Sequence, residues 1–255
     1  MLIHPLFICI SGPTSSGKST VALGLKDFLE NQQAKHGLEN LEVNLLQQDD
    51  FWYRNSYQNL KYPILTTHNI YNREISNNIK NETIFEYLIK SQIENKEIFL
   101  PNYEDESPWD WTGFFRELSF LDGLQDTSKV TLPKNFINIV EGSIIYRKTK
   151  IFNYCDYVLN LEANQETLYS RRANRKYETT AEIAKIILSR EYFDSVIWPE
   201  YLRYDEEIEQ MVESGQFLGQ GNFRKKSFYS RLPNYELSET IRFIVDLLVK
   251  NEEFY

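Results

Sequence analysis

The sequence is poor in the residues and patterns that mark several large classes of protein. Its 255 residues include only 2 cysteines, 10 glycines and 8 prolines, which excludes disulfide-framework, collagen-like and disordered chains. No apolar run approaches the roughly 20 residues that span a bilayer, and the N-terminus lacks the basic region of a secretion signal. We therefore expect a cytoplasmic protein in which Cys9 and Cys155 are buried thiols in a reducing compartment.

Basic residues are also in deficit. The 28 Lys and Arg against 37 Asp and Glu give a net charge of −9, which argues against binding nucleic acid through bulk positive charge. We expect neither nucleic acid nor a membrane as partner, so any bound anion must be held by a local concentration of donors. With 42% hydrophobic residues, the chain has the composition of an ordinary globular protein.

Short apolar runs alternate with stretches of helical periodicity. We expect strands at 6–10, 43–46, 136–140, 157–161 and, more weakly, 228–229, and helices at 18–30, 84–93 and 237–249. Continuous apolar runs suit strands buried on both faces, as in parallel sheets. The alternation of strands with helices therefore predicts a three-layer α/β fold, with a mainly parallel five-stranded sheet and helices on both faces.

Three stretches do not fit this alternation. Residues 54–58 and 62–71 carry Tyr, Pro and Asn without clear periodicity, and residues 100–126 are rich in Trp, Phe and acids. We interpret them as loops or small insertions near the ligand-binding ends of the strands. Because no linker or internal repeat divides the chain, we predict one domain, 1–255, with an insertion at 54–108.

Residues 12–19, Gly-Pro-Thr-Ser-Ser-Gly-Lys-Ser, match the phosphate-binding pattern G-x-x-x-x-G-K-[ST] in full. The glycines allow successive N–H groups to point inward, where they and the helix N-terminus cradle phosphates. Lys18 adds a point charge at the β/γ-phosphates, and the Ser19 hydroxyl can ligate Mg²⁺. The predicted nucleotide-binding residues are Gly12, Thr14, Ser15, Ser16, Gly17, Lys18, Ser19 and Thr20.

Other motifs narrow the class of phosphate-loop protein. A GTPase would need Asn-Lys-x-Asp, and the nearest string, residues 95–98, is Asn-Lys-Glu-Ile. A transporter-ATPase signature of the LSGGQ type is also missing from the sequence. The remaining interpretation is a small-molecule kinase that uses ATP and Mg²⁺, which needs an acceptor site, a base and a lid.

Acidic residues end two of the expected strands, where ligands of open parallel sheets bind. Asp49 and Asp50 follow the second strand, and Glu141 ends the third beside Gly142. One of the two aspartates can accept the proton of an attacking hydroxyl or orient that hydroxyl. Glu141 can hold Mg²⁺ or contact the acceptor.

A basic cluster stands out in this acidic chain. Arg171, Arg172 and Arg175 follow the fourth strand and a short helical run. The planar fork of arginine donates bidentately to phosphate oxygens. We therefore predict a small arginine-bearing lid at 171–180.

Four further segments add specificity to this interpretation. They are Gln48-Asp49-Asp50-Phe51, Val140-Glu141-Gly142, Arg-Arg-Ala-Asn-Arg-Lys-Tyr at 171–177, and Tyr-Phe-Asp-Ser-Val-Ile-Trp-Pro-Glu-Tyr at 192–201. Together with the phosphate loop they resemble the nicotinamide riboside kinases, members of the uridine kinase-like group of P-loop kinases. The resemblance runs in order from Ile8 to the region of Leu248, and it implies a three-layer P-loop kinase fold.

The resemblance also implies roles for matching residues. Asp49 would be the base for the ribose 5′-hydroxyl, and Glu141 would lie near the magnesium and the acceptor. Arg172 would bind ribose hydroxyls, Arg171 and Arg175 would serve the phosphates, and Tyr177 would stack on the nicotinamide ring.

A second stacking aromatic is followed directly by a diol-binding Asp in that family. The best match here is Trp109-Asp110, although Trp111 or Tyr103 could take the aromatic role. This sequence departs from the family pattern before that point, because the segment from Phe51 to Pro108 is much longer.

The expected activity is ATP-dependent phosphorylation of nicotinamide riboside to its mononucleotide. Two aromatic faces hold a flat pyridinium cation by about 0.5–2 kcal/mol each. The alternatives are a pyrimidine nucleoside, pantothenate or sugar kinase, or a nucleotide-binding regulatory protein in which residues 100–115 form a partner surface. The segment Arg231-Leu232-Pro233 is the candidate for the adenine site.

Overall fold

The computed structural model describes residues 5–36, 41–51, 88–93, 96–101, 109–123, 135–176, 187–215, 228–232 and 236–250. The chain forms two compact units. The first comprises Met1–Phe51, Trp111–Ala163 and Ile208–Tyr255, and the second comprises Trp52–Asp110 and Asn164–Glu207. The second unit thus includes both the predicted insertion and the predicted arginine-bearing segment.

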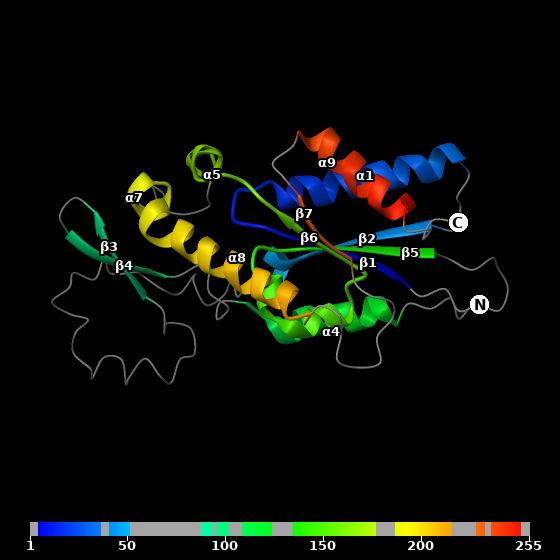
Figure 1. The fold of residues 1–255 in the computed structure, drawn as a ribbon, viewed down its shortest axis with the longest axis horizontal. Helices are drawn as coiled ribbons and strands as arrows, with labels where there is room; N and C mark the ends of the chain where they lie inside the picture. The colour runs from blue at the N-terminus through cyan, green and yellow to red at the C-terminus, as the bar shows by residue number, and fades with distance from the viewer. Residues whose placement is uncertain are drawn as a thin grey trace. The chain divides into compact units, whose positions relative to one another are not determined.

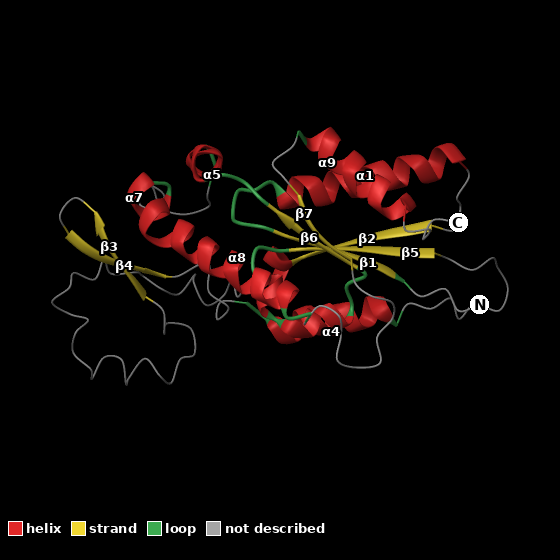
Figure 2. Ribbon diagram, in the orientation of Figure 1, coloured by secondary structure: helices red, strands yellow, loops and turns green. Residues whose placement is uncertain are grey.

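A five-stranded sheet forms the centre of the first unit (Figure 2). Its strands are β1 (Leu6–Ser11), β2 (Leu41–Gln47), β5 (Asn135–Glu141), β6 (Tyr157–Leu161) and β7 (Phe228–Leu232), in the order β2-β5-β1-β6-β7. All four neighbouring pairs are parallel. Every residue of β6 is buried, as are all residues of β1 after Leu6, which explains why apolar residues dominate both sequences.

Helices cover both faces of this sheet (Figure 1). On one face lie α1 (Lys18–His36) and α9 (Leu237–Lys250), and on the other lies α4 (Trp111–Asp122). A Cβ at Gly24 of α1 would stand 2.8 Å from Cδ1 of Ile241, so this glycine lets α1 and α9 approach closely. The predicted fold class, a three-layer α/β fold with a parallel five-stranded sheet, is confirmed.

The helix α4 corrects one interpretation of the sequence. Residues 100–126 are rich in aromatic and acidic side chains, and the sequence pattern is interpreted above as loops or small insertions, yet residues 111–122 are helical. Phe114, Leu118 and Leu121 recur at helical spacing and are buried. The ring of Phe114 meets those of Phe51 and Trp111 edge-on, at centroid distances of 5.4 and 5.7 Å. Packing on the sheet therefore selects a helix whose periodicity the neighbouring aromatics obscure.

The second unit contains an antiparallel hairpin of β3 (Leu88–Ile93) and β4 (Lys96–Pro101). The helix expected at 84–93 is therefore wrong for residues 88–93. Ile89 pairs with Leu100 and Ser91 with Ile98. A short apolar segment of this kind is compatible with either a helix or a strand, and pairing with β4 favours the strand.

From residue 164 on, the elements that the structure describes in the second unit are helical. They are α5 (Gln165–Ala173), α7 (Arg190–Tyr192), a π-helical turn at Phe193–Ile197, and α8 (Trp198–Glu213), whose residues up to Glu207 belong to this unit.

The cysteine prediction is also corrected. Cys9 of β1 and Cys155 form a disulfide, with their Cα atoms 5.8 Å apart, so neither is a free thiol. The parallel pairing of β1 with β6 brings the two together, since Ile8 is in register with Tyr157. Among the helices that the structure describes, none has the length and apolarity needed to cross a membrane.

Candidate phosphate-binding and acceptor site

The phosphate loop lies where the strand order of the sheet changes direction. It connects the carboxyl end of β1 to the first turn of α1, and β1 has β5 on one side and β6 on the other. In open parallel sheets, ligands bind beyond the carboxyl ends of the strands at such a point. The topology therefore places residues 12–19 where a nucleotide phosphate would be expected.

The backbone of this loop has the conformations that turn N–H groups toward one side. The φ angles of Ser15 and Gly17 are 66° and 97°, and such left-handed values create anion-binding nests. At Gly12, with a φ of 152°, a Cβ would lie 2.8 Å from the carbonyl oxygen of Leu161. Positive φ at Ser15 is uncommon for a residue with a side chain, and such conformations concentrate at ligand sites.

The functional side chains of the loop lie at the start of α1. Lys18 is 9% exposed, Ser19 is half-buried and Thr20 is exposed. The Ser16 amide donates to the Pro13 carbonyl oxygen over 3.1 Å, which closes the loop on itself. The loop thus has a backbone and a place in the fold that phosphate binding would require.

The carboxyl ends of three neighbouring strands carry the phosphate loop and the two predicted acidic residues, Glu141 and Asp49. Glu141 of β5 is in register with Ile10 of β1 on one side and with Gln47 of β2 on the other. The phosphate loop follows β1, and Asp49 follows β2 in the 3-10 turn η1 (Gln48–Phe51). Because adjacent strands lie about 4.8 Å apart, the ends of β1 and β2 are about 10 Å apart, with Glu141 between them.

Glu141 supplies the buried carboxyl group of this site. Only 1% of its surface is exposed, and its Oε1 accepts a hydrogen bond of 2.9 Å from Nε2 of Gln47. Its Oε2 is buried without a hydrogen-bond partner in the described part of the chain. A buried carboxylate oxygen rarely stays unpaired, so this atom fits a role as a ligand of Mg²⁺.

The described residues include no cluster of three or more His, Cys, Asp or Glu side chains that could hold a metal. Glu141 and the predicted Ser19 hydroxyl are the residues that would hold the ion.

The sequence analysis assigned no role to Gln48, which the structure places in this site. Its side chain is 1% exposed and packs on Gly142, where a Cβ would lie 2.2 Å from Oε1 of Gln48. The Ser11 hydroxyl donates to the Gly142 carbonyl oxygen over 2.9 Å. The glycine directly after Glu141 is the sequence signal, because only a residue without a side chain leaves room for Gln48. Asp49 and Asp50, next along the turn, are exposed.

The other predicted site residues belong to the second unit or lie outside the described residues. Arg171 and Arg175 are exposed at the end of α5 and just beyond it. Arg172 is only 4% exposed, and its Nε donates to the Ile187 carbonyl oxygen over 2.9 Å.

Of the residues predicted to bind the nicotinamide riboside, Trp109 is 6% exposed and Asp110 is half-buried. Tyr103 and Tyr177 lie outside the described residues.

Two alternative assignments fall in the first unit. Trp111 packs against Phe114 and Phe115 of its own helix, and the Lys148 ammonium lies 5.4 Å from its ring centroid. Arg231 at the end of β7 forms ion pairs with Glu162 and Glu209. Pro233, which belongs to the candidate segment for the adenine site, lies outside the described residues.

No family model matches the chain, and no curated protein matches its sequence. Some solved structures are similar to it. A putative fructose transport system kinase from Silicibacter sp. TM1040 is 15% identical, with a TM-score of 0.46, and the match covers 80% of this chain and 85% of that one. A gluconokinase from Sinorhizobium meliloti 1021 is 12% identical, with a TM-score of 0.42, over 98% and 95%. A shikimate kinase from Bacteroides thetaiotaomicron is 11% identical, with a TM-score of 0.40, over 95% and 98%. The substrates in these names are those of the other proteins.

Proposed function

We propose that this protein is a kinase that transfers the γ-phosphoryl group of ATP to the ribose 5′-hydroxyl of nicotinamide riboside. The observation that carries the transferase part is the succession of three neighbouring strand ends. A phosphate loop follows β1, a buried carboxylate with an unpaired oxygen ends β5, and an exposed carboxylate follows β2. This is the order in which a triphosphate, its metal and an acceptor hydroxyl would be arranged.

Each group has a defined task in this proposal. The loop amides and Lys18 bind the phosphates, and bound Mg²⁺ would neutralise charge that develops on them during transfer. Asp49 accepts the proton of the ribose hydroxyl or holds that hydroxyl in line. Since phosphoryl transfer is loose, the positioning of the acceptor contributes more than the basicity of Asp49.

The nucleoside part of the proposal rests on the sequence. The segments 171–177 and 192–201 resemble the nicotinamide riboside kinases. The predicted pair of stacking aromatics, Trp109 and Tyr177, suits a pyridinium ring, and a neighbouring carboxylate such as Asp110 adds Coulomb attraction to that cation.

A panel of acceptors tested for stimulated ATP consumption examines both parts. The panel contains nicotinamide riboside, uridine, cytidine, pantothenate and simple sugars, each with ATP and Mg²⁺. We expect nicotinamide riboside to give the largest kcat/KM, and Lys18→Ala to abolish the stimulation. A much better result with another acceptor would move the assignment to a different kinase of the uridine kinase-like group. ATP binding without stimulation by any acceptor would favour a nucleotide-binding regulatory protein.

A further inference from the structure

The helix α5 carries the arginines that are predicted to serve the phosphates. At nine residues it is too short to be stable by itself. Its N-terminal end is well capped. The Asn164 side chain accepts a hydrogen bond of 2.9 Å from the Thr167 amide, and the negative charge of Glu166 in the first turn complements the helix dipole. Its remaining stability and its orientation must come from the residues that pack against it.

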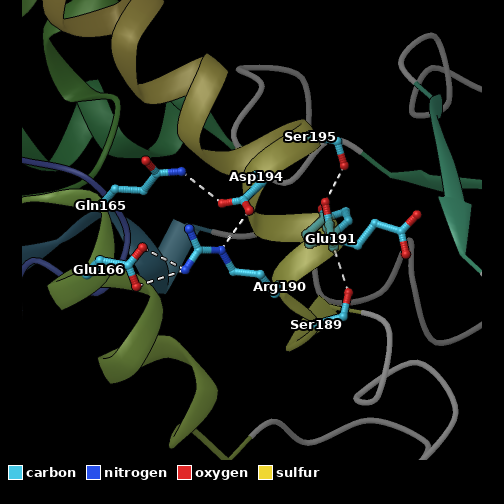
Figure 3. A network of polar contacts seen from close by, with 8 residues as sticks. Gln165, Glu166, Ser189, Arg190, Glu191, Asp194 and Ser195 are labelled. Atoms are coloured by element: carbon cyan, nitrogen blue, oxygen red, sulfur yellow. Dashed lines mark hydrogen bonds and ion pairs between the residues drawn. The ribbon is translucent and has the colours of Figure 1, made fainter.

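Arg190 of α7 is the centre of that packing (Figure 3). Its Nη1 lies 2.8 Å from the carboxylate of Glu166 in α5, and its Nε lies 2.6 Å from Oδ2 of Asp194. Its guanidinium carbon is 4.9 Å from the ring centroid of Tyr169, a second residue of α5. One side chain thus joins α5 to the segment that begins at residue 190.

Other contacts close the same interface. Nε2 of Gln165 donates to Oδ1 of Asp194 over 2.8 Å (Figure 3), and the rings of Tyr169 and Phe193 have centroids 5.6 Å apart. Asp194 and Phe193 belong to the π-helical turn that follows α7, and such turns are frequent at functional sites. The bond from Arg172 to Ile187 holds the far end of α5 in the same way.

The electrostatics keep this network charged. Hydrogen bonding to the Arg190 guanidinium holds the pKa of the Asp194 carboxyl below its ordinary value. The carboxylates of Asp194 and Glu166 raise the pKa of Arg190. Exposed ion pairs taken singly contribute little, but here one planar guanidinium is shared by two carboxylates and a tyrosine ring. Without it, the two carboxylates would lose the cation that they share.

We infer that Arg190 is a positioning residue for nucleotide binding, because it fixes α5 through Glu166, Tyr169 and Asp194 and so orients the exposed Arg171 and Arg175. This inference rests on the proposed function and on the resemblance to the nicotinamide riboside kinases, which implies that Arg171 and Arg175 serve the phosphates. Arg172, buried at the same interface, anchors the helix.

The first test compares two arginine variants of the full-length protein. Arg190→Gln removes the network, and Arg203→Gln is the control, since Arg203 is an exposed arginine of α8 that pairs with Glu200, three residues earlier in the same helix. Amide hydrogen exchange is followed in peptides that span α5. We expect exchange there to be about fivefold faster in Arg190→Gln and unchanged in the control. Equal exchange in Arg190→Gln and the unmodified protein would overturn the inference.

The second test separates positioning from a purely structural role. Arg190→Gln should raise the KM for ATP several-fold, because Arg171 and Arg175 would no longer be held in place. Arg190→Lys, which keeps the charge but not the planar fork, should restore part of the loss. An unchanged KM for ATP would overturn the positioning role even if exchange increased. Failure of the unmodified protein to bind ATP in a calorimetric titration would instead overturn the proposed function and with it the role of Arg190 in nucleotide binding.

Discussion

Gln47 and Glu141 face each other across β2 and β5, and the amide of Gln47 donates to one carboxylate oxygen of Glu141 over 2.9 Å. The two residues are 94 positions apart in the sequence, and the parallel pairing of their strands sets the contact. Because Gln47 occupies Oε1, the geometry of the other oxygen, Oε2, is fixed. The carboxylate is therefore held in place before any ligand arrives.

Glu141→Gln should weaken the use of Mg²⁺. The new amide would present its oxygen to Gln47, which puts an NH₂ donor where Oε2 now lies, and a donor cannot ligate a cation. We expect the Mg²⁺ concentration that gives half-maximal turnover to rise at least about tenfold. The control is Glu42→Gln, which neutralises a half-buried glutamate of β2 away from the strand end. The same Mg²⁺ requirement in Glu141→Gln and the unmodified protein would remove Glu141 from the metal site.

Gly142→Ala should destabilise the protein. A Cβ there would lie 2.2 Å from Oε1 and 2.5 Å from Cβ of Gln48, so the turn that leads to Asp49 would have to shift. Overpacking of this kind costs about 1–3 kcal/mol in the free energy of unfolding. Gly123→Ala is the matched control, because its Cβ would meet atoms only at 3.4 Å. Urea denaturation of the two variants compares them, and equal midpoints would contradict the close packing of Gln48.

Asp49→Asn should separate binding from turnover. Asp49 is exposed on the turn η1, so its substitution should leave the fold and the affinity for ATP unchanged. Loss of a proton acceptor and of the orientation that it gives should lower kcat by about 10²–10⁴-fold. Asp50→Asn, on the same exposed turn, is expected to retain most of the activity. Unchanged kcat in Asp49→Asn would exclude this residue as the base, and isothermal titration with ATP would show whether binding is intact.

Local sequence patterns predict the parts of the fold that depend on a few neighbouring residues. The strand at 157–161 has the predicted bounds, because its five buried residues are apolar except for Asn160. The phosphate loop is equally local, since its glycines set the backbone conformation and Lys18 follows directly in the sequence. The predicted helix from residue 18 is likewise present, as α1.

Pairing between distant segments is much harder to predict. The helix at 111–122 owes its conformation to packing on the sheet, and β3 owes its conformation to β4. The bond from Gln47 to Glu141, the cradle of Gln48 on Gly142 and the disulfide between Cys9 and Cys155 all depend on which strands become neighbours. The strand order decides those contacts, and no short pattern in the sequence specifies that order.

The Arg190 network should depend on pH only in the acid range. Since the pKa of Asp194 is lowered in the folded protein, its charged form stabilises the folded state above the pKa of an unfolded aspartate. That contribution should be constant from pH 8 down to about pH 5 and should be lost as the pH falls below about 4. The measurement is the stability difference between Asp194→Asn and the unmodified protein across this range at low salt. Arg190→Gln supplies the comparison, because without the guanidinium the difference should shrink to the part that the hydrogen bond from Gln165 contributes. An undiminished difference in the Arg190→Gln background would show that Asp194 does not act through Arg190.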